Sequence, residues 1–362
     1  MTPKEKLIEK LIKQPREFSD SDLNKLLNDE TFSEKDLRPI LLRLFDKNED
    51  TIRNDSDADV GMLGRLNRKS LRKREKVFWK RVNRGNISKL ILAEGDSWFE
   101  YPKFISEIVD QLNKRKDYAI ISLAYAGDWI SNILYEQQYI EKLSLIKPDV
   151  FLISGGGNDM VEGHRLAQLV HKRNEIEIPQ NIEVRSKEEK LKFSELCFNT
   201  EFFALLRLFK IQYKLLFKSI EQKTEKFKHL KIITQGYDYA IPSSKKGFGF
   251  NIFRIAKPIT NWIIGNGKWL NTPLLLRGYE NKEEQIAIVF GMIEFFNEMI
   301  IEVGKDYENV YHIDSRGSVD ENKGWYNELH PHGYEFKKIA SIFEKCIESS
   351  DKNKKVYKVT EE

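Results

Sequence analysis

Five short apolar runs, each ending in a polar cluster, constrain the fold of this chain more than any other feature of its sequence. They occupy residues 90–93, 118–124, 149–153, 230–234 and 310–313. Helical patterns separate or follow them at residues 104–116, 129–145, 284–305 and 333–346. Short buried strands that alternate with helices are typical of a parallel sheet with helices on both faces. The sequence therefore predicts the α/β class, as a three-layer α/β/α sandwich around a central, mostly parallel five-stranded sheet.

The rest of the chain lies outside this alternation. Residues 1–85 have helical patterns and are predicted to form an N-terminal extension, and residues 86–348 the domain that holds the sheet. Residues 349–362 are polar, and we expect a frayed tail. Two stretches interrupt the main domain, at 160–228 and 240–283, and we expect both to be insertions at the mouth of a site. The second is rich in Phe and Trp, which fits a lid over an acyl chain and a cover for the sheet edge equally well.

Length and composition indicate a globular protein. The chain has 362 residues, of which 40% are hydrophobic and 32% charged, and a formal net charge of +4 implies no polyanionic partner. Its two cysteines, Cys197 and Cys346, are too far apart for a disulfide framework or a zinc motif, and no histidine spacing suggests a metal site. We therefore expect neither a metal nor another cofactor.

The sequence contains no recognisable signal for export or membrane insertion. No apolar region of the signal-peptide type follows the first residues. The most apolar long stretch, 287–303, contains Glu294 and Glu298, whose side chains would be costly inside lipid. We expect a cytoplasmic protein without a membrane-spanning segment.

A dense basic stretch at residues 65–84 contains ten Lys or Arg against one acid, Glu75. Apolar residues are spread among the charges, so the stretch fits an amphipathic helix on an anionic membrane surface. It also fits a helix that binds nucleic acid. We favour a third interpretation, a solvated helix whose apolar residues pack on the main domain, because charge runs are usually solvated faces. A membrane surface stays open as a partner, and nucleic acid is the less expected one.

Three short clusters hold the residues that could carry chemistry. The first is Gly-Asp-Ser-Trp at residues 95–98, where Ser97 follows a predicted strand and could stand on a tight turn. A serine needs a base within hydrogen-bond reach to become a nucleophile. Taken alone, the tetrapeptide is equally typical of a turn in which Ser97 caps a helix.

The second cluster is Gly-Gly-Asn-Asp at residues 156–159, after the third predicted strand. Consecutive glycines let the backbone approach a ligand closely, and the Asn158 amide could donate to a developing oxyanion. The third is Asn-Glu-Leu-His-Pro at residues 327–331, which places His330 on the loop before the last predicted helix. The ordinary explanations are a glycine-rich turn for the second cluster and a solvated histidine for the third.

The order of the three clusters resembles the sequence blocks of the SGNH hydrolases, also called GDSL lipases or esterases. The resemblance spans about residues 88–348 and does not extend to 1–85. It implies an SGNH or flavodoxin-like sandwich, with Ser97 as the nucleophile and His330 as the general base. It further implies an oxyanion hole made by the N–H groups of Ser97 and Gly127 and by the side chain of Asn158. Trp98 and Asp159, next to two of these residues, are our candidates for substrate contacts.

The chain departs from the family pattern at one position. The family usually has aspartate three residues before the histidine, to orient the imidazole, and this chain has Asn327. The same change in a chymotrypsin-type triad lowers turnover by about 10⁴. Glu328, Asp314 or a backbone carbonyl could orient the ring instead. We favour Glu328, with Asn327 as a further positioning group.

The expected function is that of a serine hydrolase that cleaves a carboxylic ester through an acyl-enzyme on Ser97, with His330 as general base. The substrate would be a small-molecule or lipid ester, such as a lipid, a lysophospholipid or an acylated carbohydrate. One alternative is a catalytically weak SGNH fold that serves as a binding module, which Asn327 motivates. The other is a nucleic-acid-associated protein that binds through the basic N-terminal helix.

Overall fold

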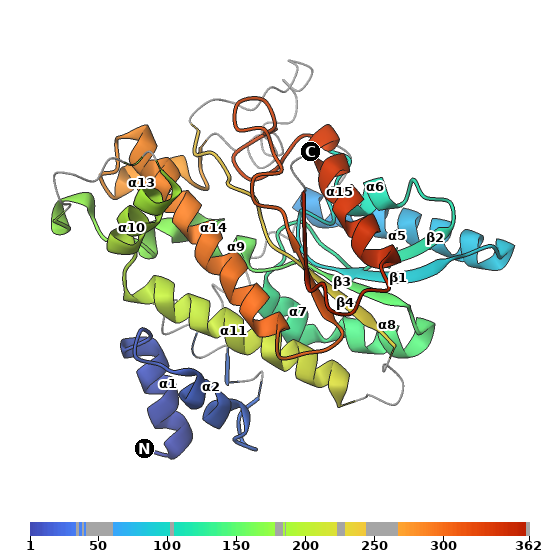
Figure 1. Ribbon diagram of the computed structural model, residues 1–362, viewed down its shortest axis with the longest axis horizontal. Coiled ribbons are helices and arrows are strands. Elements are labelled where there is room, and N and C mark those ends of the chain that lie inside the picture. Colours follow the sequence, from blue (N-terminus) through green and yellow to red (C-terminus); the bar gives the residue numbers. More distant parts are fainter. Residues whose placement is uncertain are drawn as a thin grey trace.

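The computed structural model describes residues 1–33, 36–37, 40, 61–101, 105–177, 184, 186–222, 229–243 and 267–359. Six parallel strands form one sheet in the order β2-β1-β3-β4-β5-β6 (Figure 1). The strands are β1 (Lys89–Glu94), β2 (Tyr118–Ser122), β3 (Val150–Ile153), β4 (Lys231–Gln235), β5 (Val310–Asp314) and β6 (Val356–Lys358). All five predicted strands are therefore present, and their order is that of a doubly wound flavodoxin-like sheet.

The sixth strand corrects the expectation of a frayed tail at residues 349–362. Residues 356–358 pair with β5, and Tyr357 is only 4% exposed. The N–H of His312 in β5 donates to the carbonyl of Lys355 at 2.8 Å, so the tail satisfies the otherwise open edge of that strand. A short strand of this kind carries little apolar periodicity, which is why the pattern of the sequence does not show it.

Helices cover both faces of the sheet, which confirms the predicted sandwich. In Figure 1, one layer lies above and to the right of the strands and the other lies below them. The first layer contains α5 (Gly61–Arg84), α6 (Ile108–Leu112) and α15 (Gly333–Glu348). The second contains α7 (Ile130–Glu136), α8 (Gln138–Ile146), α11 (Thr200–Glu221) and α14 (Lys282–Gly304).

Two predicted helices differ from the observed ones. The pattern at 129–145 is divided into α7 and α8, because Gln137 between them has a left-handed backbone (φ 51°). The helix expected at 104–116 is reduced to α6, which begins after the Glu107 side chain caps its first N–H groups. Residue 104 lies outside the described residues.

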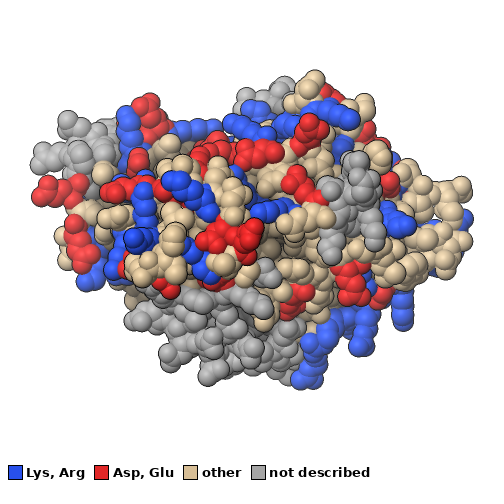
Figure 2. Space-filling model, turned by 90° about the horizontal axis from the view of Figure 1, so that it is seen from below, with Lys and Arg blue, Asp and Glu red and all other residues tan. Residues whose placement is uncertain are grey.

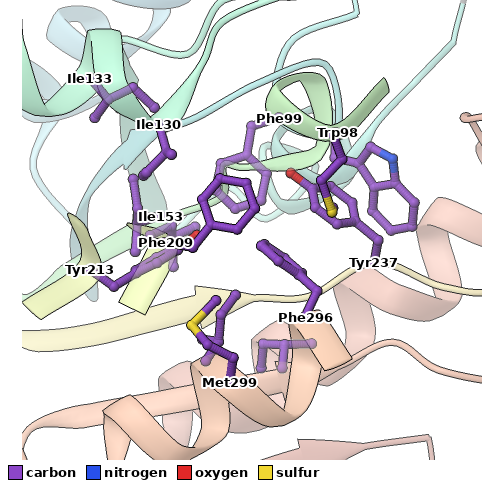
Figure 3. Packing of buried hydrophobic residues seen from close by; sticks show 14 of the residues in the cluster. Trp98, Phe99, Ile130, Ile133, Ile153, Phe209, Tyr213, Tyr237, Phe296 and Met299 are labelled. Carbon is purple, nitrogen blue, oxygen red and sulfur yellow. The ribbon is translucent and has the colours of Figure 1, made fainter. Parts of the chain in front are cut away.

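The core beneath the site is aromatic (Figure 3). Phe209 of α11 and Phe296 of α14 meet edge to face with ring centroids 5.5 Å apart, and Phe296 stacks on Tyr237 at 5.4 Å. α11 falls inside the stretch 160–228, which we expected at the mouth of the site. Instead it is largely buried, because its apolar face packs against α14 and α7.

The N-terminal helices pack on this layer. α1 (Pro3–Lys13) and α2 (Asp20–Leu27) contact α11, and Ser19 caps α2. The buried Lys210 of α11 lies 2.5 Å from Asp20 and 3.0 Å from Glu302 of α14, so one ammonium joins the N-terminal segment to two core helices.

The helix α5 is joined to the main domain by a buried ion cluster. Arg74 is 7% exposed and lies 2.9 Å from Glu100 and 3.1 Å from Asp110, and it also donates to Glu107. Arg74 further donates to the carbonyl of Phe99 at 2.8 Å. The acidic partners follow the end of β1, so α5 is anchored on the segment that carries residues 95–98.

Within the described residues, no helix is both long enough and apolar enough to cross a bilayer. The long apolar helix expected near 284–305 is α14, which is buried against α10 (Lys187–Cys197) and α11. Of the aromatic stretch 246–270, only residues 267–270 are described, and the lid prediction lies outside the described residues.

Candidate active site

Ser97 lies on a turn immediately after β1 and is 7% exposed. The preceding Gly95 passes so close to β3 that a Cβ there would lie 2.5 Å from the carbonyl oxygen of Ser154. Asp96 closes the turn, since its carboxylate accepts the N–H of Trp98 at 3.0 Å. The turn does not lead directly into a helix, so Ser97 is not a helix cap and its hydroxyl is available for other contacts.

The imidazole of His330 reaches that hydroxyl. Its Nε2 lies 2.7 Å from Ser97 Oγ, although the two residues are 233 positions apart. The loop that carries His330 is tied to the Ser97 turn, because Trp98 Nε1 donates to the carbonyl of Leu329 at 3.0 Å. Burial lowers the pKa of His330 to about 3, so the ring is neutral and can accept a proton.

Asn327 holds the ring in the tautomer that a base requires. Its Oδ1 accepts the backbone N–H groups of Leu329 and His330, each at 2.9 Å, and lies 2.9 Å from His330 Nδ1. Backbone N–H groups can only donate, so they fix which end of the Asn327 amide is oxygen. Nδ1 must then carry the proton, and the lone pair of Nε2 faces Ser97 Oγ.

The expectation that Glu328 orients the imidazole is corrected. Its carboxylate accepts four backbone N–H groups, at distances of 2.9–3.2 Å, from the two segments that flank residues 244–266. The donors are Ser243, Trp269, Leu270 and Asn271. Asp314 is not the orienting group either, because it pairs with Arg316 at 2.8 Å. Position 327 rather than 328 therefore faces the ring.

Glu328 thus holds two distant segments against the loop that bears His330. We expect Glu328→Gln to lower the free energy of unfolding by about 2–4 kcal/mol, because the amide offers one acceptor oxygen to four donors and an NH₂ group opposes the others. Thermal unfolding measures the effect. Glu321→Gln, at an exposed position of the same connection, is the control and should change stability by less than about 0.5 kcal/mol. Equal stability of the two variants would contradict this account.

The three candidate donors for an oxyanion hole are the backbone N–H groups of Ser97 and Gly127 and the side-chain amide of Asn158. Within the described residues, the backbone N–H groups of Ser97 and Gly127 have no acceptor. Gly127 has a left-handed backbone (φ 87°), which glycine adopts without strain. Asn158 donates one amide hydrogen to the carbonyl of Asp128 at 2.8 Å, which fixes the amide and leaves its second hydrogen free to donate. Ser97 and Asn158 line the same pocket.

The pocket beside Ser97 is mainly apolar. Its wall is formed by the end of β1, the short helix α9 (Gly157–Val161), the segment after β4 and one residue of α14. The side chains that line it are Asp96, Ser97, Trp98, Asn158, Met160, Val161, Tyr237, Asp238, Ala240, Met292 and Leu329. Trp98 therefore lies where a substrate contact was expected, and its indole packs edge to face on Tyr237 with centroids 5.3 Å apart (Figure 3).

Asp159 is the second correction. It is fully buried and accepts the N–H of Ile130 at 3.0 Å, at the beginning of α7. Burial raises the pKa of Asp159 to about 7. It satisfies the N-terminus of a helix that has no side-chain cap of its own, and it does not line the pocket.

Sequence reasoning missed Tyr237. Its hydroxyl donates to Asp96 Oδ2 at 2.5 Å and accepts the N–H of Gly157 at 3.0 Å, so it joins the Ser97 turn to the Asn158 turn. The signal was present in the polar cluster at residues 235–238 after the fourth strand, but nothing in that cluster distinguishes Tyr237 from its neighbours. Among the described residues, no group of three or more His, Cys, Asp or Glu side chains could hold a metal ion.

The fold is of the type that the SGNH resemblance implies. No protein-family model matches the chain, and no curated protein matches it. A structure described as a GDSL-like lipase from Parabacteroides merdae is 12% identical, with a TM-score of 0.41 over 72% of this chain and 96% of that one. A phospholipase A1 from Streptomyces albidoflavus is 12% identical, with a TM-score of 0.36 over 69% and 95%. An acetyl xylan esterase, AlAXEase, is 12% identical, with a TM-score of 0.32 over 71% and 98%.

TM-scores this low describe a partial overlap of folds and carry no information on chemistry. What the structure itself shows is a chain of two contacts: His330 Nε2 lies 2.7 Å from Ser97 Oγ, and His330 Nδ1 lies 2.9 Å from Asn327 Oδ1.

Proposed function

We propose that the protein is a serine hydrolase of carboxylic esters. The observation that carries the proposal is the 2.7 Å contact between Ser97 Oγ and His330 Nε2, with the ring held in its base tautomer by Asn327. The apolar pocket beside Ser97 supports an acyl group as the part of the substrate that enters the protein.

In this mechanism His330 removes the proton of the Ser97 hydroxyl as Oγ attacks the ester carbonyl carbon. The negative charge develops on the carbonyl oxygen, toward the N–H groups of Ser97 and Gly127 and the amide of Asn158. The alcohol leaves with the proton from His330. Water then attacks the acyl-enzyme with His330 again as base, and the acid is released.

A fluorophosphonate probe tests the proposal directly, because it reacts only with an activated serine. We expect labelling of the wild-type protein and none of the Ser97→Ala variant. Absence of labelling in the wild type, together with no hydrolysis of short p-nitrophenyl esters, would favour the alternative of a catalytically weak binding module. Asn327 motivates that alternative, since an amide orients His330 but supplies no negative charge to the imidazolium.

The pocket wall predicts which acyl chains fit. Met292 of α14 is 2% exposed and lines the pocket, so Met292→Ala should make room for a longer chain. We expect the ratio of kcat/KM for a hexanoyl over an acetyl ester to rise at least about tenfold. Met299→Ala removes a buried methionine of the same helix that does not line the pocket, and it should leave the ratio unchanged. An equal rise of this ratio in both variants would show that looser packing of α14, and not the shape of the pocket, changes the acyl-chain preference.

A further inference from the structure

The helix α5 divides its cations into two groups. Arg74 and Arg81 point into the fold, where Arg74 joins the ion cluster and Arg81 donates to the carbonyls of Asn113 and Tyr118 at 2.7 and 2.6 Å. The other eight basic residues of segment 65–84 are exposed. Within the described part of the chain none of these eight has an acidic partner. Glu75 is the one acidic residue in segment 65–84. The helix is therefore anchored by two cations and presents the rest outward, on a face we call the cationic face.

An indole lies on the cationic face. Trp79 is 43% exposed, whereas its neighbour Phe78 is 1% exposed and packs into the core. On a helix, Lys76 and Arg72 lie one and two turns from Trp79 on the same side. An exposed tryptophan among cations that have no acidic partner in the described residues is costly in water. It suits the boundary of a bilayer, where one side of the ring is apolar and the other is wet.

The buried side of α5, opposite the cationic face, contacts a segment that belongs to the candidate active site. Asn67, in the first half of α5, donates its side-chain amide to the carbonyl of Ala126 at 3.3 Å. Ala126 precedes Gly127, one of the three candidate oxyanion-hole donors. In Figure 2, Lys and Arg side chains project at the lower right, on the side of the molecule where Figure 1 places α5.

We propose that the cationic face of α5 docks the protein on an anionic phospholipid surface. The cationic face runs from Arg65 to Arg84, about 29 Å at 1.5 Å of rise per residue, along one side of a continuous helix. A side of this length and charge matches a flat layer of negative headgroups. Lipid is preferred to nucleic acid on two grounds. The first is the exposed indole, and the second is the apolar pocket lined by Trp98, whose neighbour Phe99 accepts a hydrogen bond from Arg74 of α5. The second ground rests on the proposed function; the docking itself does not require Ser97 to react.

Co-sedimentation with vesicles tests the docking. The Ser97→Ala protein, which should bind as the wild type does, is mixed with vesicles of phosphatidylcholine alone or of phosphatidylcholine with phosphatidylserine, at about 0.15 M salt. We expect binding only to the anionic vesicles. Replacing Arg72, Lys73, Lys76 and Lys80 by Gln should weaken partitioning several hundredfold, since each cation near such a surface contributes about fivefold. Trp79→Ala should weaken it further.

The matched control replaces four exposed lysines of other elements by Gln: Lys187, Lys337, Lys345 and Lys352. It removes the same charge and should retain most of the binding. The proposal is overturned if wild-type protein ignores anionic vesicles, or if both quadruple variants lose binding equally. It is also overturned if duplex DNA at equal phosphate concentration displaces the protein from the vesicles, which would identify nucleic acid as the partner. Labelling of Ser97 by a fluorophosphonate reports separately on the catalytic proposal.

Discussion

Ser97→Ala should lower kcat for a short p-nitrophenyl ester by at least about 10⁴-fold while the protein stays folded. In the proposed mechanism the serine forms the covalent bond, so without its oxygen the remaining groups can only stabilise attack by water. The stability of the fold should not change appreciably, since the hydroxyl makes one hydrogen bond, to a ring that other contacts already hold. Steady-state kinetics and thermal unfolding of the same preparation measure both quantities.

A second variant checks that the loss belongs to chemistry. His330→Gln removes the base but leaves a polar side chain, and the double variant with Ser97→Ala should be no slower than either single one, because the two residues act as a unit. Losses that multiply in the double variant would show that the residues act independently. An active Ser97→Ala protein would assign the nucleophile to another group.

Asn327→Asp should raise kcat by about 10–100-fold at neutral pH. Aspartate can accept the same three N–H groups and adds a negative charge beside the imidazolium that forms during the reaction. Its second oxygen would face the Tyr101 hydroxyl, which lies 3.5 Å from the present amide nitrogen and can donate a hydrogen bond. Asn327→Leu, which keeps the size and removes the acceptor, should lower kcat by about 10²–10³-fold because the ring loses its orientation.

The pH dependence of kcat/KM separates two effects of residue 327: orienting the His330 ring and placing a negative charge beside it. In the proposed mechanism His330 acts as a neutral base. Burial lowers its pKa from the ordinary value, so the acid limb of kcat/KM in the wild type should lie well below pH 6.5. A carboxylate at 327 favours the protonated ring, so the acid limb should move to higher pH in Asn327→Asp. An unchanged limb, or a slower Asn327→Asp enzyme, would mean that the amide is itself required.

The features of this fold that could be predicted are those that a local sequence pattern determines. Strands β1 to β5 were predictable because each is a short apolar run, and Ser97, Asn158 and His330 follow from their places at strand ends or before a helix. The choice between positions 327 and 328 was not predictable, because it depends on where backbone N–H groups of residues 243 and 269–271 end up in space. Asp159 was misassigned for the same reason: its partner is the beginning of α7, which the sequence shows as part of a longer helix.

The ion cluster around Arg74 makes the stability of the main domain depend on helix α5. Glu100 and Glu107 are both fully buried, and Arg74 supplies a compensating charge that comes from outside residues 86–348. Removing one partner from such a cluster leaves an uncompensated charge, at a cost of about 3–5 kcal/mol. A chain that began at residue 86 would have this defect within ten residues of Ser97. Helix α5 is therefore an integral part of the domain that holds the candidate site, because its Arg74 supplies the charge that offsets these two buried carboxylates.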